Sequence, residues 1–131
     1  MDEAFTADWI SGRCGALGVK TFRIWINLDH LYEIDDKDNL KINANYQRNL
    51  NNLINKLKEQ GVERFSAFAF SLLHLKKHAA WYGWAFPDPI TEYEDYFRTL
   101  QVYAKAFGML AKDFPDINYF EPLNEPDHPE G

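Results

Sequence analysis

The segment VERFSAFAF, residues 62–70, is the best single guide to the fold because it is apolar at most of its positions. A short apolar run of this kind is typical of a strand with both faces buried. We therefore predict a buried strand over residues 62–70. The segments on either side of it decide which kind of sheet it joins.

Amphipathic helices are predicted on both sides of this strand. Before it, residues 45–60 carry apolar side chains at helical spacing, and Gly61 ends the helix. These apolar residues are Tyr46, Leu50, Leu53, Ile54 and Leu57. After it, Thr91 and Glu94 form a capping box for a helix that runs to about Asp113. Its predicted buried stripe consists of Tyr93, Phe97, Leu100, Ala104, Phe107 and Ala111.

Two more strands and one more helix complete the pattern. KTFRIWIN, residues 20–27, is apolar almost throughout and predicts another strand that is buried on both faces. INYFEPL, residues 117–123, predicts the third strand, and residues 7–17 predict a helix that stops at Gly18. Helices and strands alternate, with crossovers long enough for parallel pairing. The chain is therefore predicted to be a single α/β segment over residues 1–131.

Composition excludes several classes of function. The 131 residues are 46% hydrophobic and 16% aromatic, which is ample for a packed core, and the net charge is −6. An acidic chain repels phosphate backbones, so we expect neither nucleic acid nor an anionic membrane as a partner. Cys14 stands alone, so no internal disulfide can form, and we expect a buried helix residue there.

The sequence gives few signals about the cellular location of the protein or about metal binding. The acidic start MDEAFTADWI lacks the basic and apolar regions of a secretory signal, so a cytoplasmic location is expected if this N-terminus is genuine. The acidic run 35–38 lacks the glycine and glutamate of a calcium loop, and we predict a solvated loop. His74 and His78 have ligand spacing but no evident third ligand. No metal site is predicted.

The triplet Asn124-Glu125-Pro126 carries the clearest chemical signal. It follows the third predicted strand, and functional groups collect where parallel strands end at their carboxyl edge. Pro126 restricts the backbone of Glu125 to extended conformations, which helps to fix the direction of the carboxylate.

FEPLNEPD, residues 120–127, resembles the end of the fourth strand in the clan A glycoside hydrolases, which are retaining (β/α)8-barrel enzymes. The resemblance implies a partial TIM barrel covering roughly helix one to strand four. It also implies that Glu125 is the general acid/base and that Asn124 binds the sugar 2-hydroxyl. Retaining hydrolysis needs a second carboxylate about 5–5.5 Å away and no cofactor. Because that family's nucleophile ends strand seven and a whole barrel needs about 250 residues, we expect a fragment that is inactive alone.

Further site residues follow from the resemblance and from strand alternation. Arg23 matches an inward arginine near the nucleophile, and alternation turns Glu121 toward the same interior, where Arg23 is its natural ion-pair partner. His30 follows residues 20–27 and is a candidate to line the cleft. Trp81 and Trp84 lie in an aromatic loop after residues 62–70 and are candidates to stack on a sugar ring.

One alternative stays open: a non-catalytic α/β domain that binds a ligand or a sugar. No glycine-rich turn follows any predicted strand, so the nucleotide-binding version of such a domain lacks its phosphate cradle. The partner expected for the enzyme is a carbohydrate substrate. Unpaired strand edges of a partial barrel also predict self-association.

Overall fold

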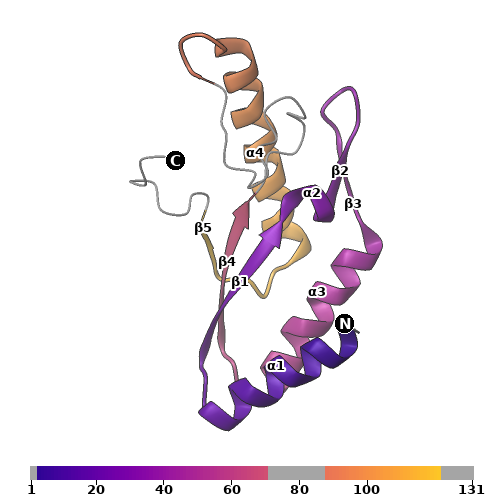
Figure 1. Ribbon diagram of the computed structural model, residues 1–131, viewed down its shortest axis with the longest axis vertical. Coiled ribbons are helices and arrows are strands. Elements are labelled where there is room, and N and C mark those ends of the chain that lie inside the picture. Colours follow the sequence, from indigo (N-terminus) through magenta and orange to yellow (C-terminus); the bar gives the residue numbers. More distant parts are fainter. Residues whose placement is uncertain (1–2, 71–87, 122–131) are drawn as a thin grey trace.

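The computed structural model describes residues 3–70 and 88–121, in which helices and strands alternate (Figure 1). In chain order the elements are α1 (Glu3–Leu17), β1 (Thr21–Asn27), α2 (Leu28–Leu31), β2 (Tyr32–Ile34), β3 (Leu40–Ile42), α3 (Ala44–Glu59), β4 (Arg64–Phe70), α4 (Tyr93–Asp113) and β5 (Tyr119–Glu121). The three predicted helices and three predicted strands are confirmed. The short helix α2 and the strands β2 and β3 were not predicted.

Strands β1, β4 and β5 form a parallel sheet in that spatial order. Helix α3 lies between β1 and β4 in the sequence, and α4 lies between β4 and β5. Each neighbouring pair of parallel strands is therefore separated in the chain by a helix, as parallel pairing requires. The chain is an α/β protein with a parallel sheet, as the order of predicted elements indicated.

Glycines end the first two long helices where the sequence predicted. Gly18 follows α1 with φ of +67°, and Gly61 follows α3 with φ of +95°. Residues with side chains rarely adopt this left-handed conformation, which is why glycine is favoured there. At its other end, α3 is capped by Asn43, whose side-chain oxygen accepts a hydrogen bond from the backbone N–H of Tyr46 at 3.0 Å.

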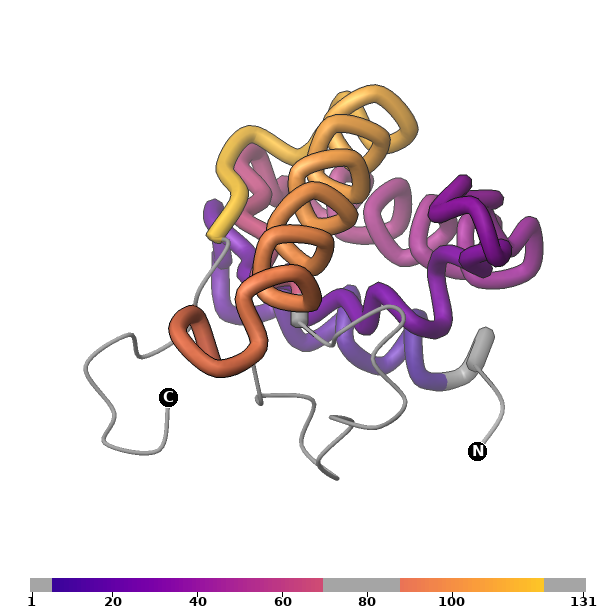
Figure 2. The backbone as a smooth tube through the Cα atoms, turned by 90° about the horizontal axis from the view of Figure 1, so that it is seen from above, coloured from indigo at the N-terminus to yellow at the C-terminus, as the bar shows by residue number. Residues whose placement is uncertain are grey.

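One face of the sheet packs against the helices and forms the core. From the strands this core contains Ile24, Ile26, Phe65, Ala67 and Ala69, and from α3 and α4 it contains Leu50, Ile54, Leu57, Val102, Ala106 and Leu110. Seen from above, α3 and α4 lie on the same side of the sheet (Figure 2). Cys14 of α1 belongs to this core with 8% exposure, so its predicted burial is confirmed.

The prediction that β1 is buried on both faces is wrong. Ile24 and Ile26 are buried, but Arg23 and Trp25, which alternate with them along the strand, are exposed. The reason is that β1 lies at one side of the three-stranded sheet that the structure describes, and the described helices pack on a single face of that sheet. The central strand β4 does fit the prediction, because Phe65 and Phe68 on its opposite faces are 2% and 3% exposed.

The predicted capping box at the start of α4 is also wrong. The helix begins at Tyr93 after Glu92, which makes no side-chain cap hydrogen bond. Instead, the carboxylate of Asp88 accepts hydrogen bonds from the backbone N–H groups of Ile90 and Thr91, at 2.7 and 2.8 Å. Asp88 therefore stabilises the turn that precedes the helix, and Thr91 lies in that turn rather than at the cap.

The buried stripe of α4 differs from the predicted one. The buried residues are Thr99, Val102, Ala106 and Leu110. Tyr93, Phe97 and Leu100, which the sequence placed in the core, are 63%, 50% and 41% exposed. Thr99 tolerates burial because its hydroxyl donates to the carbonyl oxygen of Asp95 at 2.6 Å, one helical turn earlier.

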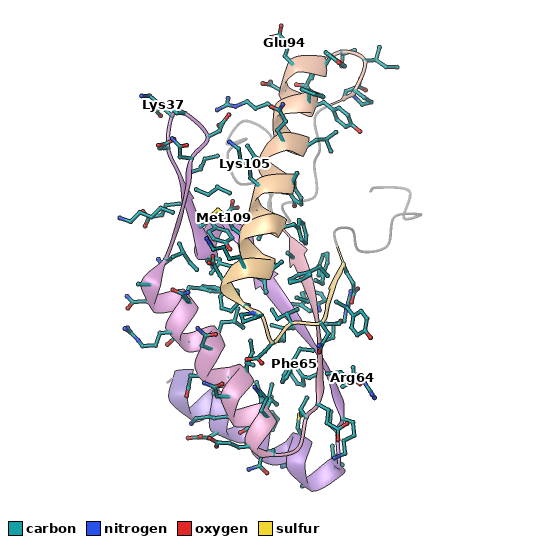
Figure 3. The ribbon with its side chains drawn as sticks, turned by 180° about the vertical axis from the view of Figure 1, so that it is seen from behind. Lys37, Arg64, Phe65, Glu94, Lys105 and Met109 are labelled. Carbon is teal, nitrogen blue, oxygen red and sulfur yellow. The ribbon has the colours of Figure 1, made fainter. Side chains whose placement is uncertain are left out.

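The acidic run 35–38 lies in the turn of the β2–β3 hairpin. Residues 35–37 are exposed, so the predicted solvated loop is confirmed, whereas the hairpin around it was not predicted. The Asp35 carboxylate accepts hydrogen bonds from the backbone N–H groups of Lys37 and Asn39, both at 2.9 Å. Arg98 of α4 donates two hydrogen bonds to the carboxylate of Asp38, at 2.6 and 2.8 Å. Lys105 lies on the side of α4 that faces the hairpin (Figure 3), and its Nζ atom donates a hydrogen bond to the backbone carbonyl oxygen of Asp38. The hairpin therefore contacts α4 through both Arg98 and Lys105.

Candidate functional site

The sheet face opposite the helices gathers polar and aromatic side chains in two rows. Strand register places Arg23, Ser66 and Tyr119 side by side in one row and Trp25, Phe68 and Glu121 in the next. Side chains alternate between the two faces along each strand, so these six residues share the face that the described helices leave uncovered. We call this surface, formed by Arg23, Trp25, Ser66, Phe68, Tyr119 and Glu121, the open face.

An ion pair between Arg23 and Glu121 crosses the open face from β1 to β5. The Nε atom of Arg23 donates to both carboxylate oxygens of Glu121 at 3.0 Å, and Nη2 donates to Oε2 at 2.6 Å. The hydroxyl of Ser66, on the intervening strand β4, donates to Oε1 at 2.8 Å. The predicted pairing of Arg23 with Glu121 is therefore confirmed, and Ser66 is a third member of the cluster.

These hydrogen bonds stabilise the ionised form of Glu121. The guanidinium of Arg23, followed by the hydroxyl of Ser66, holds the pKa of this carboxylate below its usual range. The two charged side chains are 39% and 38% exposed, so water screens part of their attraction. The cluster therefore contains one positive and one negative charge near neutral pH, and its net charge is close to zero.

This charge state predicts a specific dependence of stability on pH. Because the pKa of Glu121 is lowered in the folded state, its contribution is complete above the unfolded pKa and disappears as the pH falls through the folded pKa. For a half-exposed ion pair, we expect this contribution to the free energy of unfolding to be about 0.5–1 kcal/mol at pH 7. Urea unfolding at pH 7 and pH 3 should show that Glu121→Gln loses less stability on acidification than the parent chain. Equal losses in the two proteins would contradict this account.

Aromatic rings surround the charged cluster. The guanidinium carbon of Arg23 lies 5.3 Å from the ring centre of Phe68 and 6.0 Å from that of Trp25, within the range of cation–π contacts. The Trp25 and Phe68 rings meet edge to face, with centres 5.5 Å apart and planes 82° apart. Trp25 and Tyr119 remain 58% and 61% exposed. The open face thus combines hydrogen-bonding groups with accessible aromatic rings.

The other predicted site residues are only partly visible. His30 lies in α2, directly after β1, and its ring contacts that of Tyr46 in α3 with centres 6.4 Å apart. Its role in sugar binding stays a prediction. Trp81, Trp84, Asn124 and Glu125 lie outside the described residues. Of the predicted site residues, the structure therefore places Arg23 on the open face and His30 beside α3.

Sequence reasoning missed Trp25 and Ser66. Trp25 is two positions after Arg23, so strand alternation alone places both on the same face, and that signal was available. Ser66 gave no such signal, because its position beside Glu121 depends on the register between strands that are distant in the sequence. A single sequence does not specify that register.

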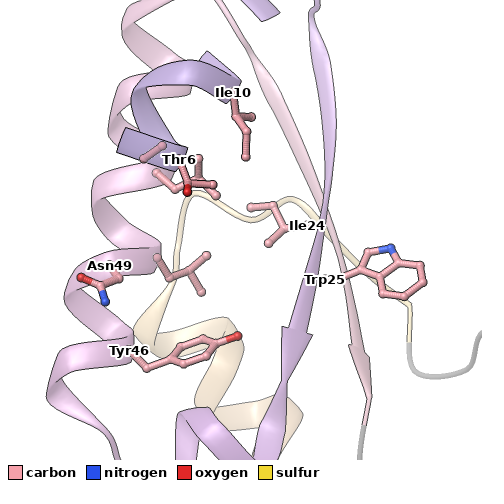
Figure 4. A pocket seen from close by; sticks show the side chains of 9 residues that line it. Thr6, Ile10, Ile24, Trp25, Tyr46 and Asn49 are labelled. Atoms are coloured by element: carbon pink, nitrogen blue, oxygen red, sulfur yellow. The ribbon is translucent and has the colours of Figure 1, made fainter. Parts of the chain in front are cut away.

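A cavity on the other side of β1 is a weaker candidate site. It has a volume of about 270 Å³, and its lining includes the apolar side chains of Ile10, Ile24, Leu50 and Leu53. Figure 4 shows the side chains of Ile24 and Trp25 on opposite sides of β1, and both residues are among those that line the cavity. Its lining contains no titratable group other than the Tyr46 phenol, whose pKa burial raises. Acid–base chemistry therefore has no suitable group there.

Residues 3–70 and 88–121 contain no helix with the length and apolar character needed to cross a bilayer. In the same residues, no group of three or more His, Cys, Asp or Glu side chains could hold a metal ion. Comparisons of the chain with protein-family models, curated proteins and solved structures found no match. The functional interpretation therefore depends on the residues and their geometry.

Proposed function

We propose that this chain is part of a (β/α)8 glycoside hydrolase that cleaves O-glycosidic bonds with retention, with Glu125 as the general acid/base. The observation that carries the proposal is the Arg23–Glu121 ion pair, which joins β1 to β5 across the open face. Strand alternation turns Glu121 toward the interior in which the resemblance places Arg23, so their pairing is an expectation of the sequence. The contact joins residues that are 98 positions apart in the sequence, and it supports the alignment that the resemblance implies.

The arrangement of the sheet supports a barrel over a doubly wound sheet. The spatial order β1-β4-β5 follows the chain order, and α3 and α4 lie on the same side (Figure 2). In a doubly wound sheet the strand order reverses and helices cover both faces. In a barrel the helices form an outer ring, and the other face lines the interior. The open face would then be interior surface close to the catalytic end.

The proposed chemistry uses two carboxylates in different protonation states. Glu125 in its protonated form donates a proton to the departing glycosidic oxygen and then, as a carboxylate, activates the water that releases the sugar. Asn124 binds the 2-hydroxyl. The nucleophilic carboxylate is proposed to come from a strand outside residues 1–131, and the mechanism needs no cofactor.

Glu121 is proposed to have a supporting role. Its carboxylate already accepts four hydrogen bonds from Arg23 and Ser66, so it is a poor candidate for a nucleophile. It lies four positions before Glu125 in the sequence. Because Arg23 neutralises its charge, Glu121 adds little negative field there. Burial and the nucleophile would then set the pKa of Glu125.

A non-catalytic sugar-binding domain is the second candidate. The exposed rings of Trp25 and Tyr119 favour it, because aromatic rings beside hydrogen-bonding groups can hold a sugar without cleaving it. Binding of an oligosaccharide without turnover by the natural protein would identify this case.

The stereochemistry of the product tests the proposed function. The full natural polypeptide that contains residues 1–131 is incubated with a panel of aryl β-glycosides, and proton NMR follows the first sugar anomer released. Retention is expected, because two successive displacements at the anomeric carbon restore its configuration. Release of the inverted anomer, or no hydrolysis of any substrate in the panel, would contradict the proposal.

A further inference from the structure

A hollow of about 470 Å³ lies between the β2–β3 hairpin and the C-terminal half of α4. The hairpin contributes Asp38, Asn39 and Leu40 to its lining, and α4 contributes Lys105, Gly108, Met109 and Lys112. Figure 3 shows Lys105 and Met109 on the side of α4 that faces the hairpin. The lining therefore combines two ammonium groups with one carboxylate and two apolar side chains.

The hairpin carboxylates near this hollow are already neutralised. Arg98 donates two hydrogen bonds to the carboxylate of Asp38, at 2.6 and 2.8 Å. The Asp35 carboxylate accepts hydrogen bonds from Asn39, which are the main cause of its lowered pKa, and the charge of Lys105 lowers that pKa further. The two carboxylates therefore face two cations of α4, and their negative charge is balanced.

Lys112 adds a positive charge in excess of these pairs. It is exposed, and no described residue forms a hydrogen bond or an ion pair with it. The hydrogen bond of Lys105 to the backbone carbonyl oxygen of Asp38 is long, at 3.4 Å, so this ammonium group can turn toward a better acceptor. The chain as a whole carries a charge of −6, so a hollow with excess positive charge stands out as a place that attracts anions.

Gly108 leaves room between the two lysines. It lies three positions after Lys105 and four before Lys112, so the three residues share one side of α4. Glycine destabilises the interior of a helix, yet a Cβ atom added at Gly108 would meet no atom within 4 Å. Packing against the described residues therefore does not require glycine at this position. The missing side chain keeps the space between the two ammonium groups open.

The hollow lies on the side of α4 that faces away from β5. The ring of Phe107 meets that of Phe120 in β5, with centres 6.3 Å apart. Phe107 is two positions from Lys105, which corresponds to about 200° around a helix, so the two side chains leave α4 in opposite directions. Further strands added beyond β5 would therefore leave the hollow accessible, and it is separate from the open face.

We propose that this hollow binds a small molecule that carries a phosphate group, with Lys105 and Lys112 as its ligands and Leu40 and Met109 in contact with its organic part. A phosphate dianion matches the charge of two ammonium groups and accepts charge-assisted hydrogen bonds from both. The two lysines are about 10 Å apart along the helix axis, and their long stems can converge on one group above Gly108. This site lies outside the proposed catalytic machinery and does not depend on it.

Calorimetric titration with phenyl phosphate at low ionic strength tests the proposal on the full natural polypeptide that contains residues 1–131. Lys105→Gln and Lys112→Gln should each weaken binding about five- to tenfold, because each removes one charge-assisted hydrogen bond. Phenol lacks the phosphate and should not bind, and benzoate, with a single charge, should bind more weakly. Raising the salt concentration to about 0.5 M should also weaken binding, because salt screens exposed charges.

Two glycine substitutions form a matched pair. Gly108 and Gly12 are both exposed within helices, and a Cβ atom added at either would meet no atom within 4 Å. Gly108→Glu places a carboxylate within three or four positions of both lysines and should abolish binding. Gly12→Glu adds the same charge in α1 and should change the affinity less than about twofold. Glutamate favours a helix more than glycine does, so urea unfolding should show that neither variant is destabilised.

Lys20→Gln is the control for the lysine substitutions. Lys20 donates to the backbone carbonyl oxygen of Gly61 at 3.3 Å, much as Lys105 does to Asp38, but it precedes β1 and does not line the hollow. Its substitution should leave the affinity for phenyl phosphate unchanged.

Three results would overturn the inference. The first is no binding of phenyl phosphate by the parent protein at millimolar concentrations. The second is an equal loss of affinity in Gly108→Glu and Gly12→Glu, which would show only a general effect of net charge. The third is tighter binding of benzoate than of phenyl phosphate. None of these measurements involves hydrolysis of a glycoside, so failure of this inference and failure of the proposed function are distinguishable.

Discussion

Replacing Leu110 by alanine is expected to lower the free energy of unfolding by about 3 kcal/mol, whereas Leu100→Ala should lower it by about 0.5–1 kcal/mol. Both leucines belong to α4, so the substitutions have the same effect on helix propensity. Leu110 is fully buried in the core, and truncating it leaves a cavity. Leu100 is 41% exposed and loses fewer contacts.

The comparison measures which side of α4 faces the sheet. Unfolding in urea at pH 7, with the free energy extrapolated to water, gives both values, and the circular dichroism of the folded variants confirms that α4 persists. If Leu100→Ala proves the more damaging substitution, α4 is rotated and the stripe through Tyr93, Phe97 and Leu100 faces the core. Equal losses would mean that another element covers Leu100 in solution.

The helix α4 also shows where sequence reasoning reaches its limit. Its sequence offers two apolar stripes, and the one with the larger aromatic residues was chosen. The structure buries the stripe with Thr99 and Ala106 instead. Thr99 counts as polar in a pattern, but its hydroxyl is satisfied inside its own helix, so it can be buried. Periodicity identified a helix, but it could not identify which stripe fits against the sheet.

Local signals were reliable where one residue determines the backbone. Gly18 and Gly61 were predicted to end helices, and both have positive φ. The β2–β3 hairpin escaped prediction because its turn depends on the Asp35 side chain accepting backbone hydrogen bonds, and its position depends on Arg98 in a distant helix. Such a hairpin is stabilised by tertiary contacts as well as by its own short strands.

The candidate site shows the same difference between features that local sequence signals predict and features that depend on long-range contacts. Strand alternation turns Glu121 toward the interior where the resemblance places Arg23, so the sequence predicts their ion pair, and the structure confirms it. Ser66 could not be found, since its contact with Glu121 depends on the register of β4 against β5. Asn124 and Glu125 lie outside the described residues, so kinetic measurements on substituted proteins test their proposed roles.

Glu125→Gln is expected to lower kcat for glycosides with poor leaving groups by about 10²- to 10⁴-fold, the usual contribution of a general acid/base. Glutamine has nearly the same size as glutamic acid but cannot give its proton to the departing oxygen. Because the proposed mechanism uses Glu125 first as the acid, it predicts that the parent protein loses activity as the pH rises above the pKa of this group. That basic limb of the pH profile should disappear in the variant.

Glu63→Gln is the control. Glu63 is an exposed carboxylate that forms a 3.6 Å ion pair with Lys20, and it immediately precedes β4, so it lies at the end of the sheet opposite the carboxyl edge. Its substitution should leave kcat and the pH profile unchanged. Steady-state rates of the full natural polypeptide and both variants are measured from pH 4 to about pH 9, a range that spans the ordinary and raised pKa values of a glutamate. A Glu125→Gln variant that retains full activity and an intact basic limb would remove Glu125 from the mechanism and leave sugar binding as the better account of the open face.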